Sequence, residues 1–187
     1  MTTTSTETGL AAATGTWVID PAHTSLAFSA RHAMVAKVRG VFSEFDGTFT
    51  IDGANPANSS ASLTIVASSI DTKVADRDAH LKSPDFLDVE AFPAITFTST
   101  AVAVKGSDIV VTGDLTIHGV TKSVDVTYEL VGISQDPWGN TKIGFEGSAK
   151  ISRKDFGLVW NAALETGGVL VGDEIKLNLD VEAAKQA

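Results

Sequence analysis

The chain has 187 residues, of which 43% are hydrophobic and 20% are charged, so a disordered or fibrous chain is excluded and a single domain is expected. Its 14 basic and 23 acidic side chains give a formal net charge of −9, so we expect no binding to nucleic acid through charge. Cysteine is absent, which excludes disulfides, thiolate metal sites and a cysteine nucleophile.

Residues 1–15 (MTTTSTETGLAAATG) are interpreted as a flexible N-terminal tail. A secretion signal needs a basic segment followed by roughly 7–15 apolar residues, whereas this tail has neither Lys nor Arg and its apolar run covers residues 10–13. No apolar stretch approaches the roughly 20 residues that span a bilayer. We therefore expect a cytoplasmic protein without stable membrane insertion, with one domain over residues 16–184 and a short tail over 185–187.

From Trp17 onward, apolar and polar side chains alternate. Alternation places one face of an extended chain in an apolar interior and the other in water, which is typical of half-buried antiparallel strands. Clusters of Gly, Pro, Asn and Asp separate the alternating runs as turns do. We predict eight strands, at residues 16–32 (with a break at Pro21), 40–51, 60–70, 93–103, 108–117, 122–131, 141–152 and 173–183.

Two connections between these strands are long. Residues 72–92 suit a short helix, with Asp71 or Thr72 as its N-cap and Pro84 at its end. Residues 153–170 contain Phe156 and Trp160 and are too apolar for a free loop. Long loops in compact domains are usually lids or binding loops, so we expect this segment to pack across one end of the fold.

Eight antiparallel strands need their edges paired, and closure into a barrel pairs all of them. We therefore predict an all-β, eight-stranded antiparallel barrel, with a two-sheet sandwich as the alternative. An eight-stranded barrel is filled by its own side chains or holds one small ligand. The predicted inward positions include several small residues between bulky ones, and these either leave room for an apolar ligand or interdigitate with their neighbours. The small ones are Ala30, Gly47, Ala61, Ala67, Gly147 and Ala149.

Several segments in a fixed order carry a resemblance to a known family. They are residues 17–28 (WVIDPAHTSLAF), 38–47 (VRGVFSEFDG), 69–72 (SIDT), 77–88 (RDAHLKSPDFLD), 92–97 (FPAITF), 113–122 (GDLTIHGVTK) and 153–158 (RKDFGL). Together they are similar to the YceI-like, polyisoprenoid-binding proteins. The resemblance implies a lipocalin-like barrel that holds a long isoprenoid chain, such as a polyprenyl tail or an isoprenoid quinone. Many members of that family are periplasmic.

We accordingly expect a protein that binds, stores or carries an apolar isoprenoid lipid inside the barrel. Phe42 and Phe156 are expected to close the ends of the cavity, and His32 to reach a ligand headgroup. The predicted ligand-binding side chains are Leu26, Phe28, His32, Phe42, Phe49, Leu63, Ile65, Phe97, Val126, Tyr128, Phe145, Phe156 and Leu177.

Catalysis is not expected, because the sequence contains no G-x-S-x-G, P-loop, G-x-G-x-x-G or H-E-x-x-H motif. Metal binding and other cofactors are not expected either, because His23, His32, His80 and His118 are dispersed along the chain. One alternative is an enzyme acting on a small apolar substrate in the same cavity, with His32 beside a carboxylate. Another is a structural barrel with a filled core. The sequence leaves a homodimer open.

Two charged clusters have two interpretations each. Residues 71–80 contain Asp71, Arg77, Asp78 and His80, and residues 153–155 read RKD. Either cluster forms a polar rim that binds a headgroup or a partner, or it caps and links neighbouring backbone segments. We favour capping and local ion pairs for both.

Overall fold

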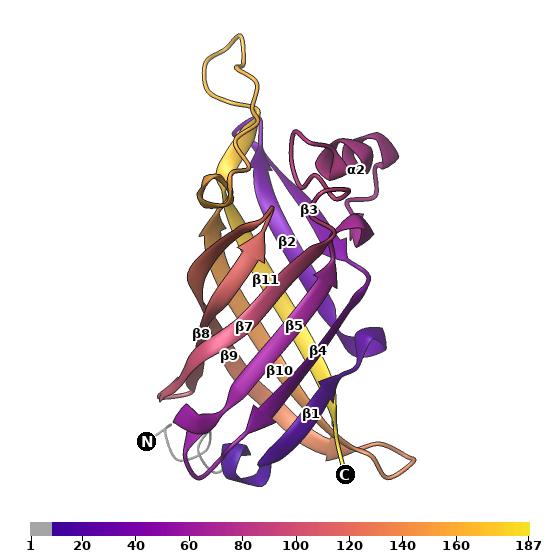
Figure 1. The fold of residues 1–187 in the computed structure, drawn as a ribbon, viewed down its shortest axis with the longest axis vertical. Coiled ribbons are helices and arrows are strands. Elements are labelled where there is room, and N and C mark those ends of the chain that lie inside the picture. Colours follow the sequence, from indigo (N-terminus) through magenta and orange to yellow (C-terminus); the bar gives the residue numbers. More distant parts are fainter. Residues whose placement is uncertain (1–8) are drawn as a thin grey trace.

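The computed structural model describes residues 9–187, which form an elongated β-barrel with α2 at one end and β1 and the C-terminus towards the other (Figure 1). These two ends are called the α2 end and the N-terminal end below. The strands are β1 (Gly15–Ile19), β2 (Ser25–His32), β3 (Ala36–Phe42), β4 (Phe45–Ile51), β5 (Ser60–Val66), β6 (Ile70–Asp71), β7 (Ala94–Lys105), β8 (Asp108–Ile117), β9 (Val120–Gln135), β10 (Thr141–Ser152) and β11 (Val171–Lys185).

The barrel closes because β1 pairs with both β4 and β11. The antiparallel order β1-β4-β5-β7-β8-β9-β10-β11 therefore returns to its first strand. β2 and β3 continue the wall beyond β1 and β4: β2 pairs with the first half of β11, and β3 pairs with β2. The predicted eight-stranded antiparallel barrel is confirmed, and the sandwich alternative is wrong.

Three of the eight predicted strands are interrupted. The break at Pro21 was expected, and there the Asp20 carboxylate accepts a hydrogen bond from the Ala22 N–H (3.0 Å) and caps the 3-10 helix η1 (Pro21–His23). The breaks between β3 and β4 and between β5 and β6 were not expected. At the second, η3 (Ala67–Ser69) forms and the Ser69 hydroxyl donates to the Val66 carbonyl (2.7 Å), a local bond that competes with the sheet ladder.

The segment between β6 and β7 covers the wall at the α2 end. β6 is the last strand in the sheet order, so the chain leaves the barrel there to form α2 (Ala75–Lys82), as predicted. The expected N-cap is wrong: Val74 precedes the helix without a side-chain cap, because the Asp71 carboxylate is already bonded to the Lys73 N–H (2.8 Å). Within residues 9–187, no helix combines the length and the apolar character needed to cross a bilayer.

Part of the predicted N-terminal tail is folded. Residues 1–8 lie outside the described residues, but residues 9–12 form a helical segment. Leu10 and Ala13 are buried, and the Trp17 indole N–H donates to the Ala13 carbonyl (2.8 Å). The predicted tail therefore does not extend to residue 15. The sequence interpretation missed this because a single large apolar residue, Leu10, gives no periodic pattern. At the other terminus, β11 continues to Lys185. The Lys185 ammonium lies 5.7 Å from the Trp17 ring centroid.

Two clusters of buried apolar side chains occupy the ends of the barrel rather than its middle. The cluster at the N-terminal end contains Leu10, Ala13, Trp17, Ile51, Ile109, Ile143 and Ala183. The cluster at the α2 end contains Ala67, Ile70, Leu87, Ile95, Leu115, Ile117 and Phe156. Neither cluster of buried side chains fills the middle of the barrel.

Candidate functional site: an apolar cavity inside the barrel

A cavity of about 700 Å³ lies inside the barrel and reaches both apolar clusters. Such a volume falls within the roughly 300–1,000 Å³ of small-molecule sites in proteins. Arg31, His32 and Val74 line the cavity at the α2 end and are exposed, so the cavity is accessible to solvent there. At the N-terminal end it stops against Leu10 and Ile51, which are buried.

Every side chain predicted to contact a ligand lines this cavity. Inward aromatic residues such as Phe28, Phe49 and Phe97 are only half-buried although they point away from bulk water. Partial exposure of an inward ring means that the interior of the barrel around it is not fully packed. The lining residues that the sequence predicted are Leu26, Phe28, His32, Phe42, Phe49, Leu63, Ile65, Phe97, Val126, Tyr128, Phe145, Phe156 and Leu177.

The inward glycines keep the cavity open in a way that the sequence interpretation missed. A Cβ atom on Gly113 would overlap the Phe97 ring, and a Cβ on Gly40 would overlap the Phe28 ring. Each ring therefore covers the backbone of a glycine on the adjacent strand. The glycines create room for aromatic rings to lie along the wall, and the rings in turn stay out of the centre.

The small residues that were expected to border empty space have different positions. Ala30 and Ala61 do line the cavity. Ala67 is packed inside the cluster at the α2 end, and a Cβ on Gly47 would meet Ile19 and Leu63 side-chain atoms at 2.7 and 3.1 Å. Some small residues therefore border the cavity and others are packed against neighbouring side chains. The barrel still contains a cavity, which argues against the alternative of a structural barrel with a filled core.

The ends of the cavity are closed by residues other than those expected. Phe42 and Phe156 were predicted to close the ends, but Phe156 belongs to the cluster at the α2 end and Phe42 packs against the same cluster, so neither lies at the N-terminal end. The opposite end is closed by Leu10 and Trp17, whose side chains are 4% and 0% exposed. Trp17 was not among the predicted ligand-binding residues, because it lies at the start of the first predicted strand, next to the predicted tail.

The polar residues before and within α2 are bonded mostly to one another. The Asp78 carboxylate accepts hydrogen bonds from the Thr72 hydroxyl (2.6 Å) and N–H (2.8 Å). The Arg77 guanidinium donates to the Thr72 hydroxyl and carbonyl, both at 2.8 Å. These contacts fix the turn into α2, as the capping interpretation proposed, while Arg77 also borders the cavity.

An aromatic group covers part of the α2 end. The rings of His80 and Trp160 lie edge to face with centroids 4.7 Å apart, and Phe86 lies 5.4 Å from Trp160. The His80 Nε2 is 2.9 Å from the Asp85 carboxylate. Trp160 comes from residues 153–170, so the part of this segment around Trp160 packs over the α2 end as expected, whereas residues 165–169 are exposed.

Arg153 organises that segment from inside the protein. It is 3% exposed, and its guanidinium donates to the carbonyls of Leu158 (2.6 Å), Trp160 (2.8 Å) and Gly172 (3.0 Å). Burial lowers the pKa of Arg153, and the carboxylate of Asp173, 3.5 Å away, opposes this shift. The arrangement supports the interpretation as a structural cluster, because the guanidinium bonds to four backbone carbonyls, Val171 included, and pairs with Asp173.

The histidines do not converge on a metal. Among residues 9–187, those that pair with a carboxylate are His23 and His80, so His32 at the cavity mouth lacks the carboxylate that the enzyme alternative requires. The Nδ1 of His118 is 3.3 Å from the Phe156 carbonyl. The four side chains therefore take separate places in the fold.

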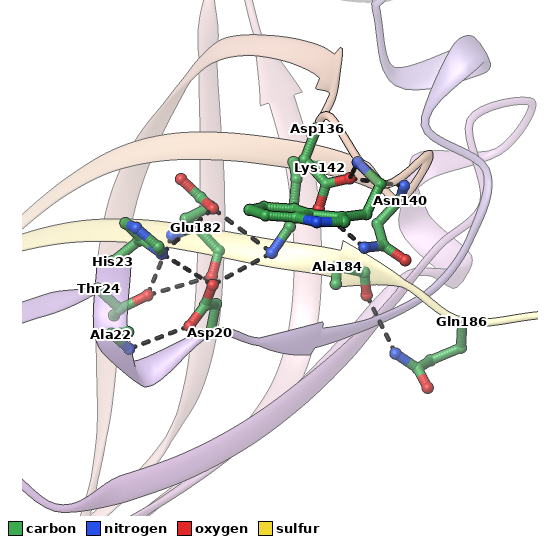
Figure 2. A network of polar contacts seen from close by, with 11 residues as sticks. Asp20, Ala22, His23, Thr24, Asp136, Asn140, Lys142, Glu182, Ala184 and Gln186 are labelled. Carbon is green, nitrogen blue, oxygen red and sulfur yellow. Dashed lines mark hydrogen bonds and ion pairs between the residues drawn. The ribbon is translucent and has the colours of Figure 1, made fainter.

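Asp20, His23 and Glu182 form the one group of metal-ligating side chains found in the described part of the chain (Figure 2). The Lys142 ammonium lies between the carboxylates, 3.1 Å from Asp20 and 3.6 Å from Glu182. The hydrogen bond from His23, followed by those from Lys142 and Ala22, lowers the pKa of Asp20 to about 2. The Lys142 ammonium therefore already supplies a positive charge to these carboxylates. The cluster joins the break between β1 and β2 to β10 and β11.

Known proteins resemble this chain in both sequence and fold. A family model described as the YceI-like domain matches residues 17–183. Protein YceI of Escherichia coli O17:K52:H18 is 42% identical over 164 residues, covering 88% of this chain and 83% of that protein, and Protein YceI of Salmonella newport is 41% identical over the same length and shares.

Solved structures agree with the sequence matches. BcnA of Burkholderia cenocepacia superposes with a TM-score of 0.75 at 26% identity, over 88% of this chain and 98% of that one. The YceI protein of Campylobacter jejuni gives 0.71 at 30% identity, over 84% and 90%. A polyisoprenoid binding domain from Saccharophagus degradans shares the fold, with a TM-score of 0.68 at 15% identity over 91% and 98%. The chain belongs to the YceI-like family.

Proposed function

We propose that the barrel cavity binds a long apolar isoprenoid lipid, a polyprenyl chain or an isoprenoid quinone, and that the protein stores or carries it. The observation that carries this proposal is the cavity of about 700 Å³ with inward aromatic and aliphatic side chains left half-exposed. The Saccharophagus degradans neighbour, a polyisoprenoid binding domain, supports the same ligand class on the same fold. The proposal involves no catalytic step, metal or cofactor.

Apolar burial alone supplies the driving force for such a ligand. Each buried CH₂ is worth about 0.8 kcal/mol, so a few isoprene units offset the cost of immobilising the chain. The ligand gains this energy without a charged contact, which fits a middle section lined by Phe28, Leu63, Phe97 and Leu177. The net charge of −9 would keep the loaded protein dispersed in water.

The α2 end is the entry route that this proposal favours. The exposed lining residues Arg31 and His32 lie there, beside Arg77 and His80. A polar headgroup passing this rim would meet donors, and His32 is the donor that the sequence singled out. Near the N-terminal end the cavity is lined by the buried Leu10 and Ile51 and by exposed hydroxyl residues such as Thr50 and Ser60, but by no charged side chain of residues 9–187.

The direct test is organic extraction of the purified protein followed by mass spectrometry. The expected result is an isoprenoid present at a substantial fraction of one molecule per chain. A variant Ala61→Trp would fill part of the cavity, and we expect at least a tenfold loss of bound lipid. Ala101→Trp, at an exposed position of β7, is the matched control and should retain the wild-type amount. Recovery of no apolar molecule, with equal and negligible uptake of added lipid by all three proteins, would refute the proposal.

A further inference from the structure

The hydroxyl of Tyr128 is an isolated hydrogen-bond donor that faces the cavity. Tyr128 is the single tyrosine among 187 residues, and it occupies an inward position of β9. Its ring covers the backbone of Gly147, where a Cβ would overlap the ring, so the side chain is held against the wall. None of the side-chain hydrogen bonds among residues 9–187 involves this hydroxyl, and no fully buried polar side-chain atom there lacks a partner, so the hydroxyl keeps accessible surface. Burial of the side chain raises the pKa of Tyr128 to about 12.

The surroundings of this hydroxyl are apolar. Tyr128 packs against the cluster at the N-terminal end, and its ring centroid is 6.3 Å from that of Phe145, which lies 5.8 Å from that of Phe49. The nearby Trp17 indole N–H is already bonded to the Ala13 carbonyl. The aromatic side chains that line the cavity next to Tyr128, Phe49 and Phe145, carry no polar atom, so the packing at this place does not itself require an oxygen.

The charged side chains that line the cavity lie elsewhere. Arg31, Asp76, Arg77 and Arg153 all belong to the α2 end. An ionised headgroup placed beside Tyr128 would therefore have no counter-charge, which is costly in an apolar interior. A pure hydrocarbon would leave the hydroxyl unpaired, which also costs free energy. An uncharged oxygen avoids both penalties.

We infer that the bound lipid places an uncharged oxygen, a carbonyl or a hydroxyl, at the N-terminal end of the cavity, where it accepts a hydrogen bond from the Tyr128 hydroxyl. The apolar chain then runs towards the α2 end. This inference rests on the proposed lipid-binding function and narrows its ligand class to neutral, oxygen-bearing isoprenoids, bound with their oxygen at the closed end.

The single tyrosine makes a site-specific test straightforward. Protein labelled with ¹³C at the tyrosine Cζ gives one resonance, which is titrated with geranylgeraniol and with the matched hydrocarbon that lacks the oxygen. We expect both to bind, and the alcohol to shift the Cζ resonance clearly more than the hydrocarbon does. In Tyr128→Phe the affinity for the alcohol should fall about three- to tenfold, as loss of one neutral hydrogen bond predicts, while the affinity for the hydrocarbon should not fall.

Control variants and probes separate the ways in which this inference fails. Thr127→Val removes a hydroxyl from the neighbouring, outward position of β9 and should change neither affinity. Equal losses for alcohol and hydrocarbon in Tyr128→Phe, or equal shifts of the Cζ resonance, would show that the hydroxyl makes no bond to the ligand. Geranylgeranyl phosphate giving the largest Cζ shift would place an ionised group there and overturn the inference. Failure of every probe to bind wild-type protein would instead refute the proposed function on which the inference rests.

Discussion

The two ends of the barrel are built differently. The N-terminal end is closed by apolar side chains in tight contact, with Trp17 and Ala13 both at 0% exposure. The α2 end is covered by a short helix and by residues 153–170, and it leaves apolar residues such as Met34 and Val35 in water, 63% and 81% exposed. We call the first end the plug and the second the cover. Under the proposed function, we expect changes in the plug to affect stability most and changes in the cover to affect ligand exchange.

The plug gives the largest expected effect. Trp17→Ala removes a fully buried ring and the indole hydrogen bond to Ala13. We expect the free energy of unfolding to fall by about 3–5 kcal/mol, as for other buried aromatic truncations. Chemical denaturation measures this, with Trp138→Ala as the control, because Trp138 is 84% exposed and its loss should change stability by less than about 0.5 kcal/mol. Similar losses for both variants would mean that Trp17 does not anchor the plug.

The cover depends on one buried cation. Arg153→Met keeps an apolar stem but removes the donors to the carbonyls of Leu158, Trp160 and Gly172. We expect a loss of about 2–4 kcal/mol, because buried carbonyls are left without partners. Hydrogen exchange should accelerate in residues 157–172 before it does so elsewhere. Lys154→Met is the control, since the Lys154 ammonium is half-exposed and its ion pair with Asp173 lies at the surface. Uniform loss of protection across the barrel would contradict a local role for Arg153.

The aromatic group at the α2 end should affect exchange more than stability. Trp160→Ala removes ring contacts to His80 and Phe86, each worth roughly 0.5–1.5 kcal/mol. We expect a stability loss of about 1–2 kcal/mol and a severalfold faster release of bound lipid, measured by transfer to acceptor vesicles. Phe92→Leu, at an aromatic contact with His118, tests whether any lost ring has this effect. An unchanged release rate in Trp160→Ala would remove this residue from the exit route.

The wall of the barrel was predictable from sequence, whereas its ends were not. Alternation in segments such as residues 108–117 and 141–152 gave strand limits that match β8 and β10, because a side-chain period of two directly reports which face is buried. It also identified inward residues such as Phe97 and Leu177. Alternation says nothing about a helical segment of four residues, which is why the plug formed by residues 9–13 was interpreted as tail.

Contacts between distant segments were also out of reach of sequence patterns. The contact of the Phe97 ring with the backbone of Gly113 depends on strand register, which a list of strands does not contain. Similarly, the Asp20 cluster joins residues more than a hundred positions apart, Lys142 among them. Pro21 predicted a strand break but not the partners that the break would bring together.

The smallest expected effect belongs to the Asp20 cluster, which is part of neither the plug nor the cover. We expect its contribution to stability to be the same with and without ligand. Hydrogen bonding, first from His23, lowers the pKa of Asp20 from 3.8 to about 2, so its contribution is present above about pH 4 and is lost as the pH falls towards 2. The pKa of His23 is raised above 6.5, chiefly by its hydrogen bond to Asp20, so that contribution is present below pH 6.5 and is lost as the pH rises through the raised value. Asp20→Asn should therefore cost most between about pH 4 and 6.5, by about 1 kcal/mol or less. Denaturation curves across pH, with the exposed Asp46→Asn as control, would show a flat difference if the cluster contributed nothing.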